Sequence, residues 1–264
     1  MTPIPAPDHW GANLPLGTVI PGENCFILNN RNYRADGTVP GFVYCGAYSA
    51  GAWNLTFAGF ALELARRGYP VIAGDCGDTP SAVGRTDGPG CWGTDANQLK
   101  LDAYRAYLQG TMGARVGKIG LLYGSHGCAL AYNWAKAHPN DAFCIAGAIG
   151  TCDLEDIRAN NRGGGGGFQA SIESRYGGND AWQSARPTHN PVEFAATLNV
   201  PQLDYFASDD PICMASTHEA LAAGNPYLTQ VEMGAVGHLF TGLFPRTATH
   251  VDAFADWVEA QLIA

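Results

Sequence analysis

The feature that most constrains the fold is a regular alternation of short apolar runs with longer segments of helical periodicity. Apolar runs of strand length lie at 41–45, 70–75, 118–123, 143–149, 202–207 and 228–233. Segments with apolar side chains on one helical face lie at 55–67, 94–112, 129–138 and 250–262. Apolar strands separated by helices are typical of a parallel sheet that is covered on both faces. Functional residues are therefore expected in the loops that follow strands, because such sheets bind ligands beyond the carboxyl ends of their strands.

Length and charge narrow the class of protein further. The chain has 264 residues, of which 46% are hydrophobic, and these values suit one α/β domain spanning residues 1–264. The net charge is −9 and there is no basic run, which argues against nucleic acid or an anionic membrane as the main partner. No apolar stretch approaches the roughly 20 residues that span a bilayer. The start carries no signal-peptide pattern, so the chain is expected in the cytoplasm or within a larger assembly.

Two regions depart from the alternation. The first 40 residues are rich in proline and glycine, with short β-prone pieces at 25–28 and 32–34 that are expected to form turns and edge strands. The segment 151–200 interrupts the pattern and contains five consecutive glycines at 163–167. Ordering a glycine run costs much conformational entropy, so this run is expected to be a mobile loop or hinge. The segment is interpreted as a cap-like or lid-like insert, with a plain surface linker as the alternative.

Three residues able to perform nucleophilic catalysis follow three of the expected strands. Ser125 follows the strand at 118–123, and Asp210 and His238 follow the last two strands. A serine hydroxyl is a weak nucleophile, so an imidazole must accept its proton, and a carboxylate must hold that imidazole in one tautomer. The other histidines are less suited, because they lie in the irregular start, in loops or at helix ends. A helix-capping serine is the alternative interpretation of Ser125.

The order serine, acid, histidine along the chain resembles the α/β-hydrolase superfamily, serine esterases and lipases in particular. The resemblance runs from Gly41 to Ala264 and implies a mostly parallel central sheet with helices on both faces. It also implies cleavage of a carboxylic ester through an acyl-enzyme on Ser125. The acid of this family tends to precede a Pro-Ile-like step, which favours Asp210 over its neighbour Asp209. Tyr123 departs from the family pattern, since a small residue normally stands two positions before the serine.

The same resemblance predicts the groups that surround the reacting ester. The oxyanion hole is expected to use the backbone N–H of His126 and that of Ala47, in the loop after the strand at 41–45. The family usually has His-Gly at the end of that strand, and here Cys45 replaces the histidine. Tyr48 is the alternative to Ala47 as a donor, through its backbone N–H or its hydroxyl. Tyr48 and Trp92 are also expected to bind substrate.

A second resemblance suggests a different class of function. The stretch Cys91-Trp-Gly-Thr-Asp95 resembles one found in hydrolase-like chains of tailed bacteriophages. Tyr123, the replacement of the family histidine by Cys45 and the lack of a signal-peptide pattern support an alternative hypothesis, a catalytically inactive protein of the same fold that binds or builds a larger assembly such as a virion. The expected partner is a small-molecule ester under the first hypothesis, with a homo-oligomer or larger protein assembly left open.

The cysteines and glycines do not form a cofactor motif. The eight cysteines include no C-x-x-C pair, so the spacing predicts no zinc site. Neither a P-loop nor a dinucleotide-binding fingerprint is present, and no cofactor is expected. The cysteines are expected to be reduced and largely buried, although a disulfide among Cys76, Cys91 and Cys152 is left open.

Overall fold

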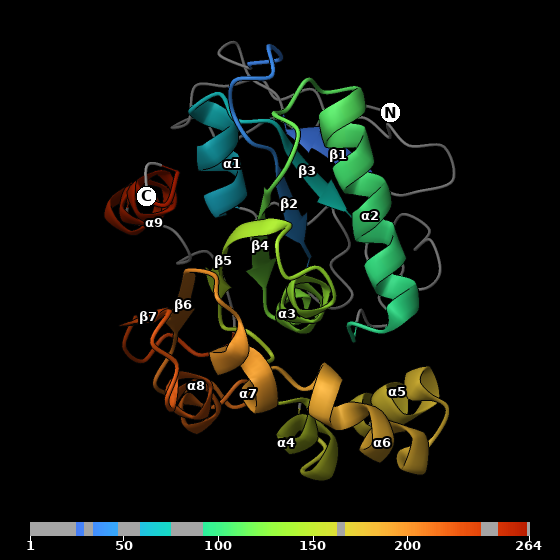
Figure 1. Cartoon of the computed structure of the whole chain (residues 1–264). Helices are drawn as coiled ribbons and strands as arrows, with labels where there is room; N and C mark the ends of the chain where they lie inside the picture. The colour runs from blue at the N-terminus through green and yellow to red at the C-terminus, as the bar shows by residue number, and fades with distance from the viewer. Residues whose placement is uncertain are drawn as a thin grey trace, which may run out of the picture.

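A central sheet of seven strands organises the molecule in the computed structural model, which describes residues 25–28, 34–46, 59–74, 92–162, 167–238 and 248–262 (Figure 1). The strand order is β1-β3-β2-β4-β5-β6-β7. The strands are β1 Cys25–Leu28, β2 Phe42–Cys45, β3 Val71–Gly74, β4 Ile119–Gly124, β5 Ala142–Ala148, β6 Gln202–Phe206 and β7 Leu228–Glu232. β1 pairs antiparallel with β3, and the other neighbouring pairs are parallel. The predicted mostly parallel sheet is confirmed. Of the piece expected at 32–34, only Arg34 is described, and it is not in a strand.

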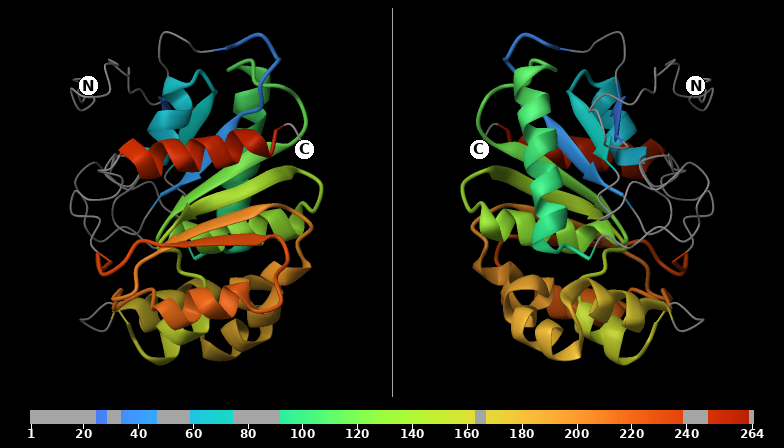
Figure 2. Two further views of the ribbon diagram at one scale, coloured as in Figure 1. Left: turned by 90° about the vertical axis from the view of Figure 1, so that its left-hand side faces the viewer. Right: turned by 90° about the vertical axis from the view of Figure 1, so that its right-hand side faces the viewer.

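Helices cover both faces of the sheet, as predicted. One face carries α1 Gly59–Arg66 and α9 Ala248–Ala260, and the other carries α2 Asp95–Gly110, α3 Gly127–Ala137 and α8 Ala215–Ala222. The two side views separate these layers, with α9 in front of the sheet in one and α2 in the other (Figure 2). Successive strand side chains point to opposite faces. Phe42 and Tyr44 of β2 therefore join the core under α1 and α9, whereas Val43 and Cys45 join the core under α2 and α3.

The start of α2 is set by a local hydrogen-bond pattern. The Thr94 side chain accepts a bond from the Asn97 backbone N–H, and the Asn97 side chain accepts one from the Thr94 backbone N–H. This reciprocal capping satisfies two amides that the first turn of a helix leaves without partners.

The segment 151–200 is helical, and its helices were not predicted from the sequence. It holds α4 Leu154–Ala159, α5 Gly167–Tyr176, α6 Asn179–His189, α7 Pro191–Phe194 and a 3-10 turn at Ala195–Thr197. Gly167 is the first residue of α5, and residues 163–166 of the glycine run lie outside the described part of the chain. Whether the segment acts as a cap or lid stays a prediction.

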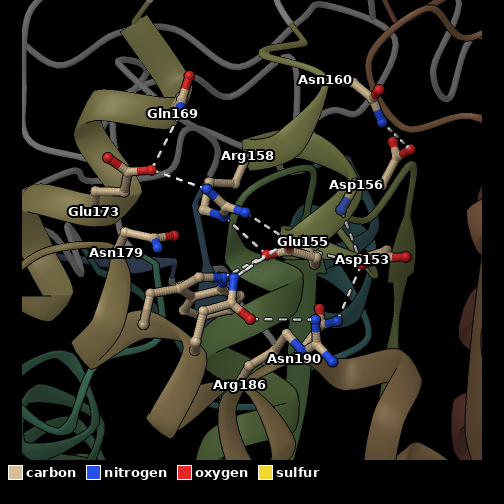
Figure 3. Close-up of polar contacts among 12 residues, drawn as sticks. Asp153, Glu155, Asp156, Arg158, Asn160, Gln169, Glu173, Asn179, Arg186 and Asn190 are labelled. Atoms are coloured by element: carbon tan, nitrogen blue, oxygen red, sulfur yellow. Dashed lines mark hydrogen bonds and ion pairs between the residues drawn. The ribbon is translucent and has the colours of Figure 1, made fainter.

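Glu155 is the centre of the polar contacts within this segment (Figure 3). Its carboxylate accepts two bonds from the Arg158 guanidinium, at 2.6 and 2.8 Å, and one from the Trp182 indole at 2.6 Å. Arg158 also bonds to Glu173 of α5 at 2.9 Å. Trp182 and Leu154 lie in a small apolar core beneath these contacts. Side-chain bonds therefore join α4, α5 and α6 into one unit.

Five cysteines are described with their side chains, and all are buried: Cys45, Cys128, Cys144, Cys152 and Cys213. Cys152 forms no disulfide, while Cys76 and Cys91 lie outside the described residues. Within the described ranges, no helix is both long and apolar enough to cross a membrane.

Candidate active site

Ser125 occupies a sharp turn between β4 and α3. Its φ is +48°, in the left-handed region that residues with a Cβ rarely adopt. The backbone of the turn is held on both sides: the Ser125 N–H donates to Ala148 O and the Thr151 N–H donates to Ser125 O, each at 3.0 Å. Such strained backbone persists only where the surrounding structure holds it, and it clusters at functional sites. Ser125 does not cap α3, because the N-cap of this helix is His126 and the cap makes no side-chain hydrogen bond.

Gly127 allows α3 to approach the end of β2 closely. A Cβ at this position would lie 2.1 Å from Cys45 O and 2.5 Å from Cys45 C. Both are backbone atoms, which cannot move aside without shifting the strand. A side chain at position 127 would therefore separate the helix from the strand that leads into the predicted oxyanion loop.

Tyr123 fits at the turn because two glycines make room for its ring. A Cβ on Gly147 would lie 2.4 Å from Tyr123 Cγ, and one on Gly150 would lie 2.9 Å from Tyr123 Cε2. The ring is buried, and its hydroxyl donates to Asp204 Oδ1 at 2.9 Å. The departure from the family pattern is thus compensated by small residues on the neighbouring strand and loop, and the tyrosine points away from Ser125 into the core.

The chain brings Ser125, His238 and Asp210 together from the ends of β4, β7 and β6. Ser125 Oγ lies 3.0 Å from His238 Nε2, and His238 Nδ1 lies 2.8 Å from Asp210 Oδ2. The Asp210 side chain is fully buried, whereas that of His238 is 16% exposed. This arrangement can move a proton from the serine hydroxyl to an imidazole that a carboxylate orients.

The two adjacent aspartates have different partners. The second carboxylate oxygen of Asp210 accepts the backbone N–H groups of Ile212 and Cys213, at 2.8 and 2.9 Å, so the acid is fixed while it faces His238. Asp209 instead accepts the Gly237 N–H at 2.6 Å, one residue before the histidine. Asp210 therefore orients the imidazole, and Asp209 ties the loop that carries the histidine to the loop that carries the acid.

His126 and Trp92 are packed inside the protein. Their rings meet edge to face, and neither side chain is more than 1% exposed. Trp92 donates its indole N–H to Ser171 of α5 at 2.8 Å, and its carbonyl accepts the Tyr176 hydroxyl at 2.8 Å. Burial, together with the nearby His238, lowers the pKa of His126 to about 3. The His126 imidazole is therefore neutral near pH 7. Trp92, expected to contact substrate, joins the helical segment to the nucleophile turn in this structure.

The predicted oxyanion residues are described in part. His126 is the N-cap of α3, and helix N-termini present backbone N–H groups and a positive dipole end to an anion. Ala47 and Tyr48 lie outside the described residues. The strand before them is described: Cys45 of β2 is the register partner of Tyr123. The predicted roles of Ala47, His126 and Tyr48 stay predictions.

A polar cluster behind the nucleophile turn was missed from the sequence. Asp204 of β6 and His218 of α8 are fully buried and joined at 2.6 Å. His218 lies in the first turn of α8, and its side chain is fully buried. The available signal for this cluster was a charged residue, Asp204, at the centre of a buried strand.

Comparison with known proteins identifies the fold of the chain. No family model and no curated protein matches it. The solved structures of similar shape include the Pyrococcus furiosus esterase Pf2001, with a TM-score of 0.63 and 16% identity over 97% of this chain and 95% of that one. Another is the alpha/beta hydrolase MGS-MChE2 from a lagoon-sediment metagenome, with a TM-score of 0.60 and 13% identity over 93% of this chain and 98% of that one. A third is the Pyrococcus horikoshii acylaminoacyl peptidase, with a TM-score of 0.63 and 13% identity over 92% of this chain and 40% of that one. The chain has the α/β-hydrolase fold.

Proposed function

We propose that this chain, built on the α/β-hydrolase fold, is a serine hydrolase that cleaves a carboxylic ester. Ser125 would act as nucleophile, His238 as general base and Asp210 as the orienting acid. The observation that carries the proposal is the unbroken relay from Ser125 Oγ to His238 Nε2 at 3.0 Å and from His238 Nδ1 to Asp210 at 2.8 Å. Two successive hydrogen bonds of this kind give the serine proton a path to an oriented imidazole, which packing alone does not require.

The chemistry follows from these contacts. Ser125 Oγ attacks the ester carbonyl carbon while its proton passes to His238 Nε2. The carbonyl oxygen becomes an oxyanion, for which the N–H of His126 and that of Ala47 are the proposed donors. The C–O bond of the ester then breaks, and the leaving alcohol takes the proton from His238. A water molecule, deprotonated by the same imidazole, attacks the acyl-enzyme, and the proton returns to Ser125 Oγ as the acid leaves.

The ester is preferred over an amide substrate, and the partner is proposed to be a small molecule. The α/β-hydrolase fold does not select the scissile bond, because it is found in both an esterase and an acylaminoacyl peptidase. A binding or structural role in an assembly such as a virion is the alternative, and no contact among the described residues favours it.

Covalent labelling and turnover test the proposal together. Wild-type protein is incubated with a fluorophosphonate probe, with short p-nitrophenyl esters and with the matching p-nitroanilides. We expect labelling and ester hydrolysis by the wild type, with turnover lower by about four orders of magnitude in Ser125→Ala and His238→Ala. Folded wild-type protein that neither reacts with the probe nor hydrolyses any ester would rule out the enzyme. Faster anilide than ester cleavage would retain a serine hydrolase but reject the substrate class.

A further inference from the structure

Three side chains of types that can bind a metal ion lie close together in the core behind the nucleophile turn. Cys152 comes from the loop between β5 and α4, Asp204 from the middle of β6, and His218 from α8. One donor atom from each lies within 4.8 Å of the other two. All three side chains are completely buried. A thiol, a carboxylate and an imidazole rarely share a dry core, because buried polar groups need partners or an ion.

The separations of the donors suit a tetrahedral ion of the size of Zn²⁺. Cys152 Sγ lies 3.5 Å from His218 Nδ1. Zinc–sulfur and zinc–nitrogen bonds of about 2.3 and 2.0 Å at a tetrahedral angle separate the two ligand atoms by about 3.5 Å. His218 Nδ1 and Asp204 Oδ2 are 2.6 Å apart, as a hydrogen-bonded pair. An ion between them would widen this distance by less than about 1 Å, since two such ligands lie about 3.3 Å apart.

Groups around the three donors already orient the carboxylate. The Tyr123 hydroxyl donates to Asp204 Oδ1 at 2.9 Å, and the Gln230 amide donates to Asp204 Oδ2 at 3.2 Å and to His218 O at 2.7 Å. Outer partners of this kind hold metal ligands in place in proteins.

We propose that Cys152, Asp204 and His218 form a structural binding site for a thiolate-accepting divalent cation, of which Zn²⁺ and Co²⁺ are examples. Binding releases the Cys152 thiol proton and the proton that His218 Nδ1 shares with Asp204, so that Nδ1 faces the ion and the other imidazole proton stays on Nε2. One thiolate and one carboxylate then balance the two positive charges. The ion would tie β6 and α8 to the loop that follows β5, the loop whose Thr151 N–H holds Ser125 O. Sequence spacing cannot reveal this site, because its ligands come from three separate elements.

Metal content and spectroscopy of the full chain test the site without relying on the proposed hydrolase activity. Because the donors are enclosed, the protein is produced in medium supplemented with Co²⁺ or with Zn²⁺, so that the ion is present as the chain folds. We expect about one ion per chain after exhaustive dialysis, and the cobalt protein should show a thiolate-to-cobalt charge-transfer band. X-ray absorption of the zinc protein should show a sulfur neighbour at about 2.3 Å besides nitrogen or oxygen at about 2.0 Å.

Matched variants locate the ion. Cys152→Ser and Asp204→Asn should lose the ion and the charge-transfer band, whereas Cys144→Ser, a buried thiol on the other face of the sheet, should keep both. Cys213→Ser is the second control, because Cys213 lies beside Asp210 and His238 in another group of donor atoms. Folded wild-type protein without a retained ion, or with only oxygen and nitrogen neighbours around it, would overturn the site. So would an ion that Cys213→Ser removes and Cys152→Ser retains. If neither Cys152→Ser nor Asp204→Asn folds, the wild-type metal content and sulfur neighbour, with the Cys213→Ser control, still decide the matter.

Discussion

At the scale of single residues, the nucleophile turn depends on space that glycines leave open. Gly147 of β5 faces Tyr123, and a Cβ there would lie 2.3 Å from the Tyr123 carbonyl oxygen and 2.4 Å from its ring. The carbonyl belongs to the strand that delivers Ser125, so it cannot yield as the end of a flexible side chain could. The identity of residue 147 thus constrains the position of a serine hydroxyl to which it is not bonded.

We expect Gly147→Ala to reduce fluorophosphonate labelling of Ser125 by at least about tenfold, because misplacement of a nucleophile by about 1 Å can cost 100-fold in rate. Gly110→Ala is the matched control. Nothing lies within 4 Å of a Cβ at position 110, so labelling of that variant should equal that of the wild type. Equal labelling of both variants would contradict the packing role of Gly147.

The two neighbouring aspartates should separate in a rate measurement. Asp210→Asn removes the charge that orients His238 and should lower kcat by about 10⁴-fold. Asp209→Ala removes only the acceptor of the Gly237 N–H, and we expect a loss of about tenfold to 100-fold. Asp209→Asn keeps an acceptor oxygen and should behave nearly as the wild type. A larger loss in Asp209→Ala than in Asp210→Asn would show that the acid had been assigned to the wrong residue.

At the scale of elements, charged side chains join the helices of the 151–200 segment to one another. The hydrogen bond from Arg158 lowers the pKa of Glu155 from 4.5 to about 2, with a further contribution from the Trp182 indole and against the opposing effect of burial. A carboxylate whose pKa is lower in the folded than in the unfolded state stabilises the fold above the unfolded pKa. That stabilisation is lost as the pH falls from about 4.5 through about 2.

Glu155→Gln should therefore lower the free energy of unfolding by about 1 to 3 kcal/mol at pH 7, where the charged bonds to Arg158 are present. The difference between variant and wild type should shrink as the pH falls from about 5 towards 2.5. Urea unfolding of both proteins across this range, followed by Trp182 and the other tryptophans, measures the difference. If the difference in unfolding free energy between variant and wild type stays constant with pH, the effect of the substitution comes from packing and not from charge.

At the scale of the whole molecule, the last helix closes one face of the sheet against the first half of the chain. Phe254 of α9 stacks on Phe60 of α1 with ring centroids 3.8 Å apart, and both rings are buried. Arg67, just after α1, bonds to Asp256 and Glu259 of α9 at 2.6 and 2.7 Å. Residues nearly 200 positions apart thus share one core, and loss of α9 would expose the strands beneath it.

Phe254→Ala should reduce the free energy of unfolding by about 3 to 5 kcal/mol, the usual cost of removing a fully buried phenylalanine. Leu99→Ala, on the exposed face of α2, is the control and should change it by less than about 0.5 kcal/mol, since Leu99 is 68% exposed. Urea denaturation of both variants provides the measurement. Similar changes in the free energy of unfolding for Phe254→Ala and Leu99→Ala would mean that α9 adds little to the stability of the core.

The strands and main helices were predictable because their signals are local. Apolar runs and helical periodicity located β2 to β7 and α9 within a few residues. The helices α4 to α6 were not predicted, because a glycine run precedes α5 and Pro187 lies inside α6. Their helices are stabilised by contacts with one another and with Trp92, which no local pattern contains.

Sequence by itself determined which side chains were available for chemistry and in what order they follow the strands. The meeting of Ser125 with His238, 113 residues later, depends on parallel strands that bring their carboxyl ends to one edge of the sheet. Only the tertiary structure decided that Asp210 faces the imidazole while Asp209 bonds to the loop before His238. It also decided that the Tyr123 ring packs against Gly147. Only the fold decided, too, that Cys152, Asp204 and His218 share one buried cluster. The physical reason is that these contacts join residues far apart in the chain, whose directions are set by strand register and packing and not by local conformational preference.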